Sequence, residues 1–310
     1  MQKLFLLDAY ALIYRSYYAF IKNPRINSKG LNTSAIMGFL NTLNEVLTKE
    51  KPTHIGVAFD PHGPTFRSEA FPAYKAQREE TPEDIRKAVP IINDLLKAYR
   101  IPILQVDGYE ADDVIGTLAE KAGSIGVETY MLTPDKDYGQ LVRDNVFIYR
   151  PRHGGGYETM GPKEVCAKYD IPSPMAVIDL LALMGDSADN FPGCPGVGEK
   201  TAVKLINEFG SIEKLIERSS EIKGKLREKV EEHVDDIKMS YFLATIKTDV
   251  PIELDMESLK LVEPNEDELG KLLLELEMKS FADRVLKKSQ KPQKVVNQQL
   301  DLFAEFAADG

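Results

Sequence analysis

The sequence has few residues that bind soft metals. It contains two cysteines, Cys166 and Cys194, and four histidines in 310 residues. The cysteines are too few and too far apart for a disulfide framework or a thiolate zinc site, and the histidines show no ligand spacing. Any bound metal must therefore take oxygen ligands.

A long apolar run is also missing. Val177–Met184 is interrupted by Asp179 and falls far short of the roughly 20 residues that a membrane span needs. Near the N-terminus, Leu4–Leu7 is shorter than the roughly 7 to 15 apolar residues of a secretory signal. We therefore expect a cytoplasmic protein with no membrane partner. Its 43% hydrophobic and 28% charged residues indicate an ordinary globular chain, long enough for about two domains.

Positive charge is scarce overall. The chain has 49 acidic and 39 basic residues, a net charge of −10, which argues against a nucleic-acid partner because a polyanion is normally bound by a basic surface. The charge is sorted by region, however. The stretch from 66 to 78 carries Arg67, Lys75 and Arg78 against Glu69 alone. Some of the acidic residues could serve to hold cations.

Hydrophobic periodicity predicts an α/β first part and a helical second part. Short apolar runs at 4–7, 54–59, 102–106 and 127–132 predict buried strands, and helical patterns at 10–20, 33–48, 82–99 and 110–122 lie between them. This order predicts a mostly parallel sheet covered on both faces. After about residue 159 the strand signal disappears, and 162–169, 175–184, 198–209, 211–217, 224–246 and 265–277 are all predicted helices. We predict an α/β core over 1–184, a helical domain over 185–288 and a flexible tail over 289–310.

Acidic residues cluster where the predicted strands end. In a parallel sheet these ends converge on one edge, where open α/β folds bind their ligands. A further pair opens the helical part with a three-residue spacing, which can place both acids on one face. The nine residues are Asp8, Asp60, Glu110, Asp112, Asp113, Asp135, Asp137, Asp186 and Asp189.

So many carboxylates need cations nearby, since each pair at about 4 Å repels by about 1 kcal/mol even in water. Hard oxygen ligands select Mg²⁺ or Mn²⁺. Two such ions would stabilise the attacking and leaving oxygens of an in-line phosphoryl displacement. Any single Asp after a strand is more often a helix cap or a turn former. Four strand ends, two of them doubled, make chance a poor explanation of the whole set.

Six motifs together resemble one family, the 5′-nuclease domain at the N-terminus of bacterial DNA polymerase I. The likeness extends in unbroken order from Met1 to about Lys287, and every acidic position of the family pattern is filled. It implies a PIN-like core, a helical arch at about 61–100 and a helix-three-turn-helix (H3TH) domain. The motifs are Asp8 with Tyr14-Arg15, Asp60 with Phe66-Arg67 and Tyr74-Lys75, Gly108–Asp113, Thr133–Asp137, Gly185–Asn190 and Gly196–Ala202.

The resemblance also implies roles for single residues. One metal would be held by Asp8, Asp60, Glu110, Asp112 and Asp135, and the second by Asp137, Asp186 and Asp189. Asp113 would bridge the two ions or lie near them. The catalytic set would comprise Lys75, Arg67, Asp8 and Asp113.

The stretch 66–78 combines cations with aromatic residues, which suits a strand whose phosphates need charge and whose bases need a stacking face. On sequence alone, an ordinary solvated loop is an equally good interpretation. The resemblance makes Arg67, Tyr74, Lys75 and Arg78 arch residues that contact DNA, with Lys75 near the scissile phosphate. Arg15 becomes a phosphate clamp.

Residues 192–202 form a candidate helix-hairpin-helix turn. Glycine tolerates positive φ and leaves backbone N–H groups bare, and the following helix N-terminus attracts an anion. A Gly-x-Gly alone is as often a plain tight turn, whereas the surrounding motif favours a phosphate site at Gly196, Gly198, Lys200 and Thr201. We expect Gly198 to need positive φ. The resemblance adds K⁺ bound by the hairpin carbonyls.

These patterns predict a monomeric, structure-specific 5′-3′ exonuclease and 5′-flap endonuclease that removes RNA primers and displaced strands in replication and repair, and that forms the N-terminal part of a DNA polymerase I. A free-standing flap endonuclease and a non-catalytic DNA-binding module are the alternatives. In the tail, Gln299, Leu300, Asp301, Leu302 and Phe303 resemble the motif by which bacterial replication proteins bind the sliding clamp. The same residues could instead dock on their own domain or on a following one.

Overall fold

The computed structural model describes residues 2–152 and 155–286. These form two compact units, one ending at Asn265 and one beginning at Glu266. The first unit contains both the α/β part and most of the predicted helical part. The predicted boundary at 184 therefore marks a change of secondary structure and stays a prediction as a domain boundary.

A six-stranded sheet in the order β3-β2-β1-β4-β5-β6 forms the centre of the first unit. Every pairing is parallel except that of β5 with β6. This confirms the predicted mostly parallel, PIN-like core. The strands are β1 (Lys3–Asp8), β2 (His54–Ala58), β3 (Ile103–Leu104), β4 (Glu128–Leu132), β5 (Val146–Pro151) and β6 (Tyr157–Met160).

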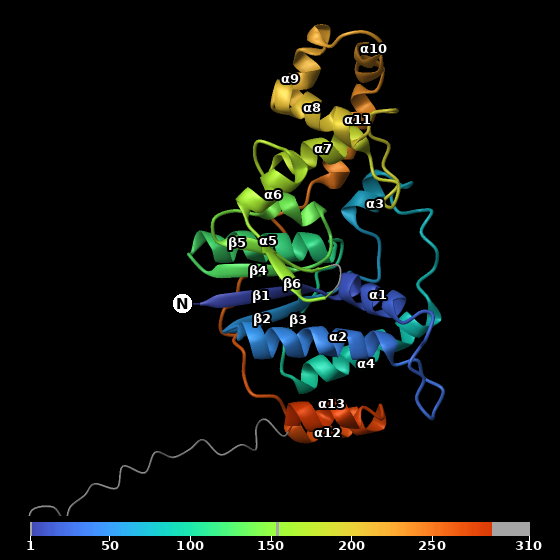
Figure 1. Ribbon diagram of the computed structural model, residues 1–310, viewed down its shortest axis with the longest axis vertical. Helices are drawn as coiled ribbons and strands as arrows, with labels where there is room; N and C mark the ends of the chain where they lie inside the picture. Colours follow the sequence, from blue (N-terminus) through green and yellow to red (C-terminus); the bar gives the residue numbers. More distant parts are fainter. Residues whose placement is uncertain (1, 153–154, 287–310) are drawn as a thin grey trace, which may run out of the picture. The chain divides into compact units, whose positions relative to one another are not determined.

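Helices cover both faces of this sheet (Figure 1). On one face lies α5, whose apolar residues pack on β1 and β4, and the other face carries a layer in which α2 contacts both α1 and α4. The central strand β1 is buried along nearly its whole length, as expected for a strand covered on both faces. These elements are α1 (Ala9–Ala19), α2 (Ser34–Glu45) with a π-helical turn η1 (Val46–Glu50), α3 (Phe66–Ala70), α4 (Glu83–Ala98), α5 (Ala111–Ser124) and the 3₁₀ turn η2 (Asp137–Leu141).

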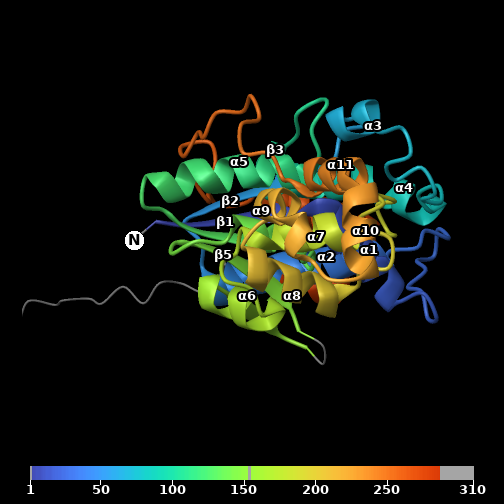
Figure 2. The ribbon, with the colours of Figure 1, turned by 90° about the horizontal axis from the view of Figure 1, so that it is seen from above.

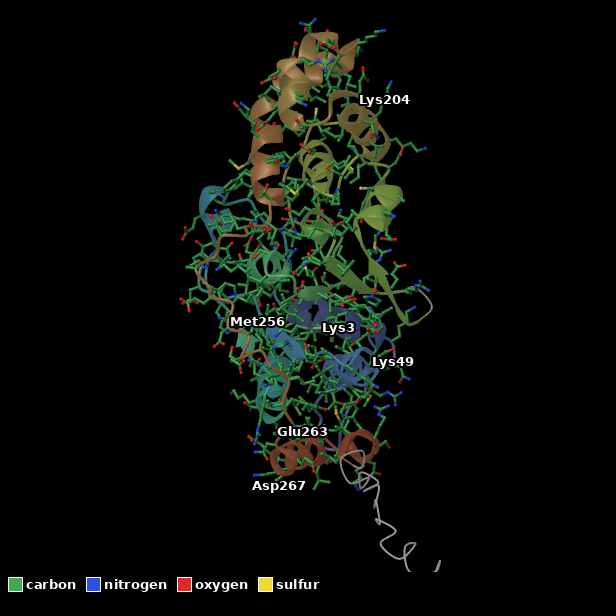
Figure 3. The ribbon with its side chains drawn as sticks, turned by 90° about the vertical axis from the view of Figure 1, so that its left-hand side faces the viewer. Lys3, Lys49, Lys204, Met256, Glu263 and Asp267 are labelled. Atoms are coloured by element: carbon green, nitrogen blue, oxygen red, sulfur yellow. The ribbon has the colours of Figure 1, made fainter. Side chains whose placement is uncertain are left out.

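The chain after β6 is helical, as predicted. Helix α7 packs against η2 of the α/β part and against α8 and α11 of the helical part, which joins the two parts through one apolar core. Figure 2 shows α7 to α11 gathered together, and Figure 3 shows Lys204 on α8 among them, far from Lys3 at the start of β1. The elements are α6 (Pro162–Tyr169), α7 (Ala176–Met184), α8 (Glu199–Phe209), α9 (Ile212–Glu217), η3 (Ser219–Glu221), α10 (Lys225–Glu232) and α11 (Val234–Ala244).

Several boundaries differ from the sequence prediction. Strands β5 and β6 were not predicted, although Val146–Tyr149 has the β-branched and aromatic composition of a strand. The predicted helix over 224–246 is two helices that meet at His233. Within the predicted arch, only α3 and α4 are helical, and residues 71–82 form turns and irregular backbone.

The second unit contains, among its described residues, α12 (Glu266–Glu275) and α13 (Lys279–Leu286), which pack on each other. Helix α12 was predicted and α13 was not. Across the described part of the chain, no helix is both long enough and apolar enough to span a bilayer.

Candidate active site

A cavity of about 850 Å³ opens where β1, β2 and β4 end. Its wall contains nine carboxylates and three Lys or Arg side chains. Eight of the nine predicted acids lie in this one wall, joined by Glu79, which the prediction did not include. The eight are Asp8, Asp60, Glu110, Asp112, Asp135, Asp137, Asp186 and Asp189.

The acids at the strand ends also have local structural roles. Asp8 caps α1 by accepting a hydrogen bond from the backbone N–H of Ala11 (3.1 Å), and its other oxygen accepts from Tyr138 Oη (3.1 Å) and Thr133 Oγ1 (3.2 Å). Asp60 accepts from the backbone N–H of Ala111 at 2.7 Å. The helix-cap interpretation and the ligand interpretation therefore both apply, because a cap fixes the carboxylate at the cavity wall.

Burial and mutual repulsion disfavour the charged form of most of these groups. Burial, with Asp60 and Asp135 close by, raises the pKa of Asp8 to about 7. Burial likewise raises the pKa of Asp60, and burial together with a neighbouring carboxylate raises the pKa of Asp112, Asp135 and Asp137. The three Lys and Arg side chains of this wall are too few to balance the charge of its nine carboxylates.

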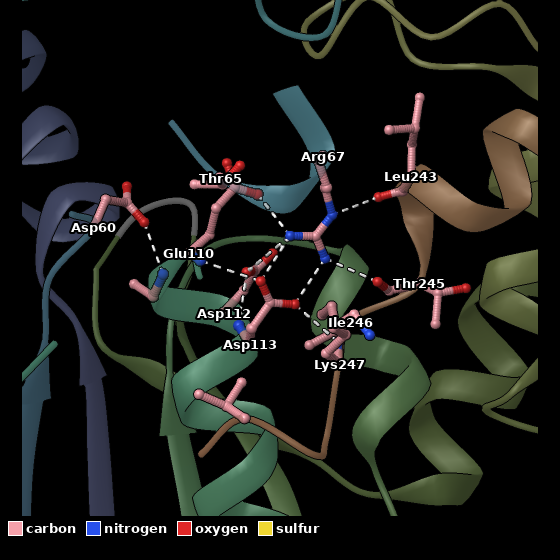
Figure 4. A network of polar contacts seen from close by, with 12 residues as sticks. Asp60, Thr65, Arg67, Glu110, Asp112, Asp113, Leu243, Thr245, Ile246 and Lys247 are labelled. Atoms are coloured by element: carbon pink, nitrogen blue, oxygen red, sulfur yellow. Dashed lines mark hydrogen bonds and ion pairs between the residues drawn. The ribbon is translucent and has the colours of Figure 1, made fainter. Parts of the chain in front are cut away.

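Arg67 lies behind the cavity lining, in a buried layer that we call the inner wall, and is only 1% exposed (Figure 4). The carboxylates that line the cavity form the outer wall. Its guanidinium donates to Glu110 Oε2 and to both Asp113 oxygens, each at 2.8 Å. The remaining donors reach the carbonyls of Leu243 (2.9 Å) and Thr245 (2.8 Å). All five N–H donors are thus used within the protein. The prediction that Arg67 contacts DNA is wrong for this structure, because a strand cannot reach a guanidinium that is buried and fully bonded.

Asp113 is fully buried and does not line the cavity. Besides Arg67, the backbone N–H groups of Lys247 (2.8 Å) and Glu110 (3.1 Å) donate to its oxygens. It lies in one acidic group with Glu110 and Asp112. Its bonds, however, favour a role as the counter-ion of Arg67 over the predicted bridging and catalytic role.

Glu110 is the link between the two walls. Tyr74 Oη donates to Glu110 Oε2 at 3.0 Å, and Lys75 Nζ donates to Oε1 at 2.5 Å. Burial alone would raise the pKa of Glu110, but Lys75 and Arg67 lower it overall. Tyr74 is 6% exposed, so it supports Glu110 from within the wall and is not the exposed stacking face that the sequence predicted. Lys75 does reach the cavity.

Two more cations lie on the cavity wall. Arg78, predicted as an arch residue, forms an ion pair with Asp189, and Lys136, which was not predicted, pairs with Asp186 at 3.2 Å. Both side chains are about half exposed, so they can exchange partners more readily than Arg67 can. Lys136 lies between the predicted acids Asp135 and Asp137, so its position in the motif Thr133–Asp137 already placed a cation near the site.

Aromatic residues of α1 form another part of the wall. Tyr10 and Tyr14 line the cavity, and their ring centroids lie 6.4 Å apart. Arg15 is exposed but is absent from the cavity wall, because it follows Tyr14 and points to another side of the helix. Its predicted contact with a phosphate stays a prediction, and the structure does not bring it to the acids.

The predicted hairpin lies away from the cavity. Gly196 has φ +78° and is exposed. Gly198 has φ −94° and precedes α8 as its N-cap, so the expectation that it needs positive φ is wrong. Lys200 and Thr201 follow in the first turn of α8. The suggested clamp-binding residues 299–303 lie outside the described residues.

Hard divalent cations fit the donor set of this cavity. Nine carboxylates and a single imidazole, His62, are the candidate ligands in its lining, and neither cysteine lines it. Asp137 Oδ1 is buried without a hydrogen-bond partner, which leaves a lone pair free for a cation. Together with the raised pKa values of the neighbouring carboxylates, this indicates that bound metal ions would balance the charge of the wall.

Two family models match nearly the whole described part of the chain. The model of the 5′-3′ exonuclease N-terminal resolvase-like domain matches residues 3–170, and that of the 5′-3′ exonuclease C-terminal SAM fold matches residues 172–267. The chain belongs to the 5′-3′ exonuclease family.

Relatives within this family occur in two lengths. The chain is 42% identical to DNA polymerase I of Bacillus subtilis over 287 residues, which is 92% of this chain and 32% of that protein. It is 38% identical to a 5′-3′ exonuclease of Aquifex aeolicus, covering 92% of this chain and 96% of that one. The chain thus spans about a third of the length of its polymerase relatives.

Solved structures share the exonuclease fold at low identity. T5 5′-exonuclease with bound zinc has a TM-score of 0.67 and 21% identity, covering 89% of this chain and 99% of that one. The catalytic core of Rad2 in complex with a DNA substrate has a TM-score of 0.59 and 18% identity, covering 93% of this chain and 92% of that one.

Proposed function

We propose that this exonuclease-family chain hydrolyses phosphodiester bonds near free 5′ ends, as a 5′-3′ exonuclease and 5′-flap endonuclease that acts on displaced strands and RNA primers in replication and repair. The observation that carries the proposal is the gathering of eight family-motif carboxylates in one cavity. A protein that only bound DNA would gain nothing from a wall whose charge opposes DNA.

Two Mg²⁺ or Mn²⁺ ions are the proposed cofactors, and the coarser conclusion, a divalent metal, is supported by the donor set and by the zinc-bound relative. We assign Asp8, Asp60, Glu110, Asp112 and Asp135 to one ion, and Asp137, Asp186 and Asp189 to the other. When bound, the ions would supply Lewis-acid stabilisation of the attacking and leaving oxygens.

The remaining groups of the wall bind and orient the substrate. The Lys75 ammonium would approach the scissile phosphate and stabilise charge that develops there. Arg78 and Lys136 supply two further cations that a phosphate can recruit from their carboxylate partners. Tyr10 and Tyr14 offer ring faces on which an unpaired base can stack.

Duplex DNA is the proposed partner of the helical part. The exposed turn at Gly196 and the N-terminus of α8 suit a phosphate of the duplex. From the same family resemblance we also propose that the hairpin carbonyls bind a K⁺ ion and that the tail binds a sliding clamp. The Rad2 relative crystallised with its DNA substrate supports a DNA partner in general.

The test is cleavage of a labelled 5′-flap by the purified chain in Mg²⁺ and in EDTA. We expect nicking at the flap junction in Mg²⁺, none in EDTA, and recovery on adding Mn²⁺. Binding of the flap in both buffers without cleavage in either would instead identify a non-catalytic DNA-binding module.

A further inference from the structure

Lys75, which lines the cavity, and Asn190, which follows the lining residue Asp189, both combine a side chain with a left-handed backbone. Their φ angles are +56° and +58°. L-residues adopt this conformation rarely, and Asn does so more readily than Lys. A Lys held there requires surroundings that impose the conformation.

The segment that carries Lys75 has little regular structure of its own. Residues 71–82 lie between α3 and α4, and local bonds such as Tyr74 N–H to Phe71 O (2.8 Å) form only single turns. The opposing loop, from Gly185 to Gly193, is better braced. Asp186 and Phe191 exchange both backbone hydrogen bonds at 3.1 Å, and Gly193 N–H donates to the buried Ser240 Oγ at 2.8 Å.

Several hydrogen bonds join the irregular segment to the braced loop, among them bonds from Tyr74 and Arg78 to Asp189. We call three of them, which lie on both sides of Lys75 and at its own backbone, the clasp. Asn190 Nδ2 donates to the carbonyl of Ala73 at 2.7 Å, and the Lys75 N–H donates to the carbonyl of Asp189 at 2.9 Å. Gln77 Nε2 donates to the carbonyl of Ser187 at 2.7 Å. The clasp brackets Lys75 on both sides, while its ammonium extends to Glu110.

We propose that Asn190 is a positioning residue for Lys75. Its amide holds the Ala73 carbonyl, two residues before Lys75, and so fixes the backbone from which the ammonium reaches the cavity. Asn suits this place because it tolerates the left-handed conformation and still supplies a donor. The role of Lys75 in cleavage rests on the proposed function, whereas the clasp itself does not.

The variant Asn190→Gly separates the two properties of Asn, because it keeps the left-handed backbone and removes the donor. We expect single-turnover cleavage of a 5′-flap in Mg²⁺ to slow about tenfold, with the Kd for the flap and the Kd for Mn²⁺ unchanged within about twofold. Asn145→Gly is the matched control, because it removes a hydrogen bond from a side-chain amide to the carbonyl of Gly123, neither residue of which lines the cavity. This variant should cleave at the normal rate.

A double-mutant cycle with Lys75→Met distinguishes positioning from general support. If Asn190 acts through Lys75, adding Asn190→Gly to Lys75→Met should change the rate less than twofold. A full tenfold loss in that background, or a normal rate for Asn190→Gly alone, would overturn the proposal.

Hydrogen–deuterium exchange tests the clasp without any activity. Asn190→Gly should speed exchange in peptides over 71–80 about tenfold while peptides over β1 stay protected. Unchanged exchange in that segment would refute the clasp. Wild-type protein that fails to cleave while this exchange result holds would refute the proposed function alone.

Discussion

The inner and outer walls share Glu110 but otherwise carry different acidic residues, and they balance their charge differently. On the inner wall, Glu110 and Asp113 share the buried guanidinium of Arg67, which satisfies them with fixed hydrogen bonds. On the outer wall, Asp8 and Asp135 have no such partner, and burial and neighbouring carboxylates raise the pKa of each.

This difference separates acids whose charge the protein itself balances from acids whose charge a bound cation would balance. A buried carboxylate paired with a buried Arg is stable without metal, and it holds its neighbours in place. A buried carboxylate among other carboxylates is stable only when protonated or when bound to a metal ion. Sequence motifs contain both kinds and do not distinguish them.

Removing the inner counter-ion should have the largest effect. In Arg67→Met, Glu110 and Asp113 stay buried without their partner, and the carbonyls of Leu243 and Thr245 lose a donor. We expect the free energy of unfolding to fall by about 3 to 5 kcal/mol, the usual cost of breaking a buried ion pair. Urea denaturation in EDTA measures it.

Arg78→Met is the matched comparison, because the same side chain is lost from a half-exposed ion pair with Asp189. It should cost less than about 1 kcal/mol. Similar losses in both variants would contradict the distinction between the fixed cation and the exchangeable one.

The outer wall should respond to pH through Asp8. Its pKa is raised to about 7 in the folded protein from an ordinary value of 3.8, so the folded state retains a proton that the unfolded chain has released. Without metal, the stability from this group is present below about pH 4 and is lost as the pH rises through about 7. Metal binding requires the carboxylate, so its affinity should rise over the upper part of that range.

Calorimetric titration with Mn²⁺ measures this competition. Because at least the proton of Asp8 competes with the ion, the apparent affinity should rise by at least about tenfold per pH unit below pH 7. An affinity that is constant from about pH 5.5 to 7.5 would show that Asp8 is already ionised in the metal-free protein.

The sequence was sufficient for the parts of the site that depend on chain order. Acids at the ends of parallel strands must converge, so the cavity and six of its carboxylates followed from the order of strands. Asp186 and Asp189 follow helix α7 and were added through their three-residue spacing and the family motif. The core strands β1 and β2 were equally clear, because they are buried along almost their whole length. Strand β4 begins with the polar Glu128 and ends in the buried Met131 and Leu132. Short edge strands such as β6 have half-exposed, mixed residues and give a weak periodic signal.

Tertiary placement of long polar side chains could not be predicted. Arg67 lies in a basic, aromatic stretch typical of a DNA contact, and only the fold shows that it turns inward to Asp113 and Thr245. Gly198 shares the motif of Gly196, yet the backbone there is extended and Gly196 alone of the two is left-handed. Residues such as Lys136 and Asn190 were within quoted motifs but had no signal that marked their partners.

The sharpest test of the outer wall is a small gain in stability from Asp135→Asn. The amide keeps an oxygen that can accept from the backbone N–H of Asp137, now at 3.0 Å from Asp135 Oδ1, and it removes one negative charge that desolvation at the cavity wall and Asp189 disfavour. At pH 8 in EDTA we expect the free energy of unfolding to rise, but by less than about 1 kcal/mol, because the side chain is partly open to solvent. In Mg²⁺ the same variant should lose nearly all cleavage while still binding the flap. The exposed Asp144→Asn controls for the loss of charge in general and should change neither quantity. A variant at 135 that is less stable than wild type in EDTA would mean that the carboxylate is already balanced, and would remove the contrast between the two walls.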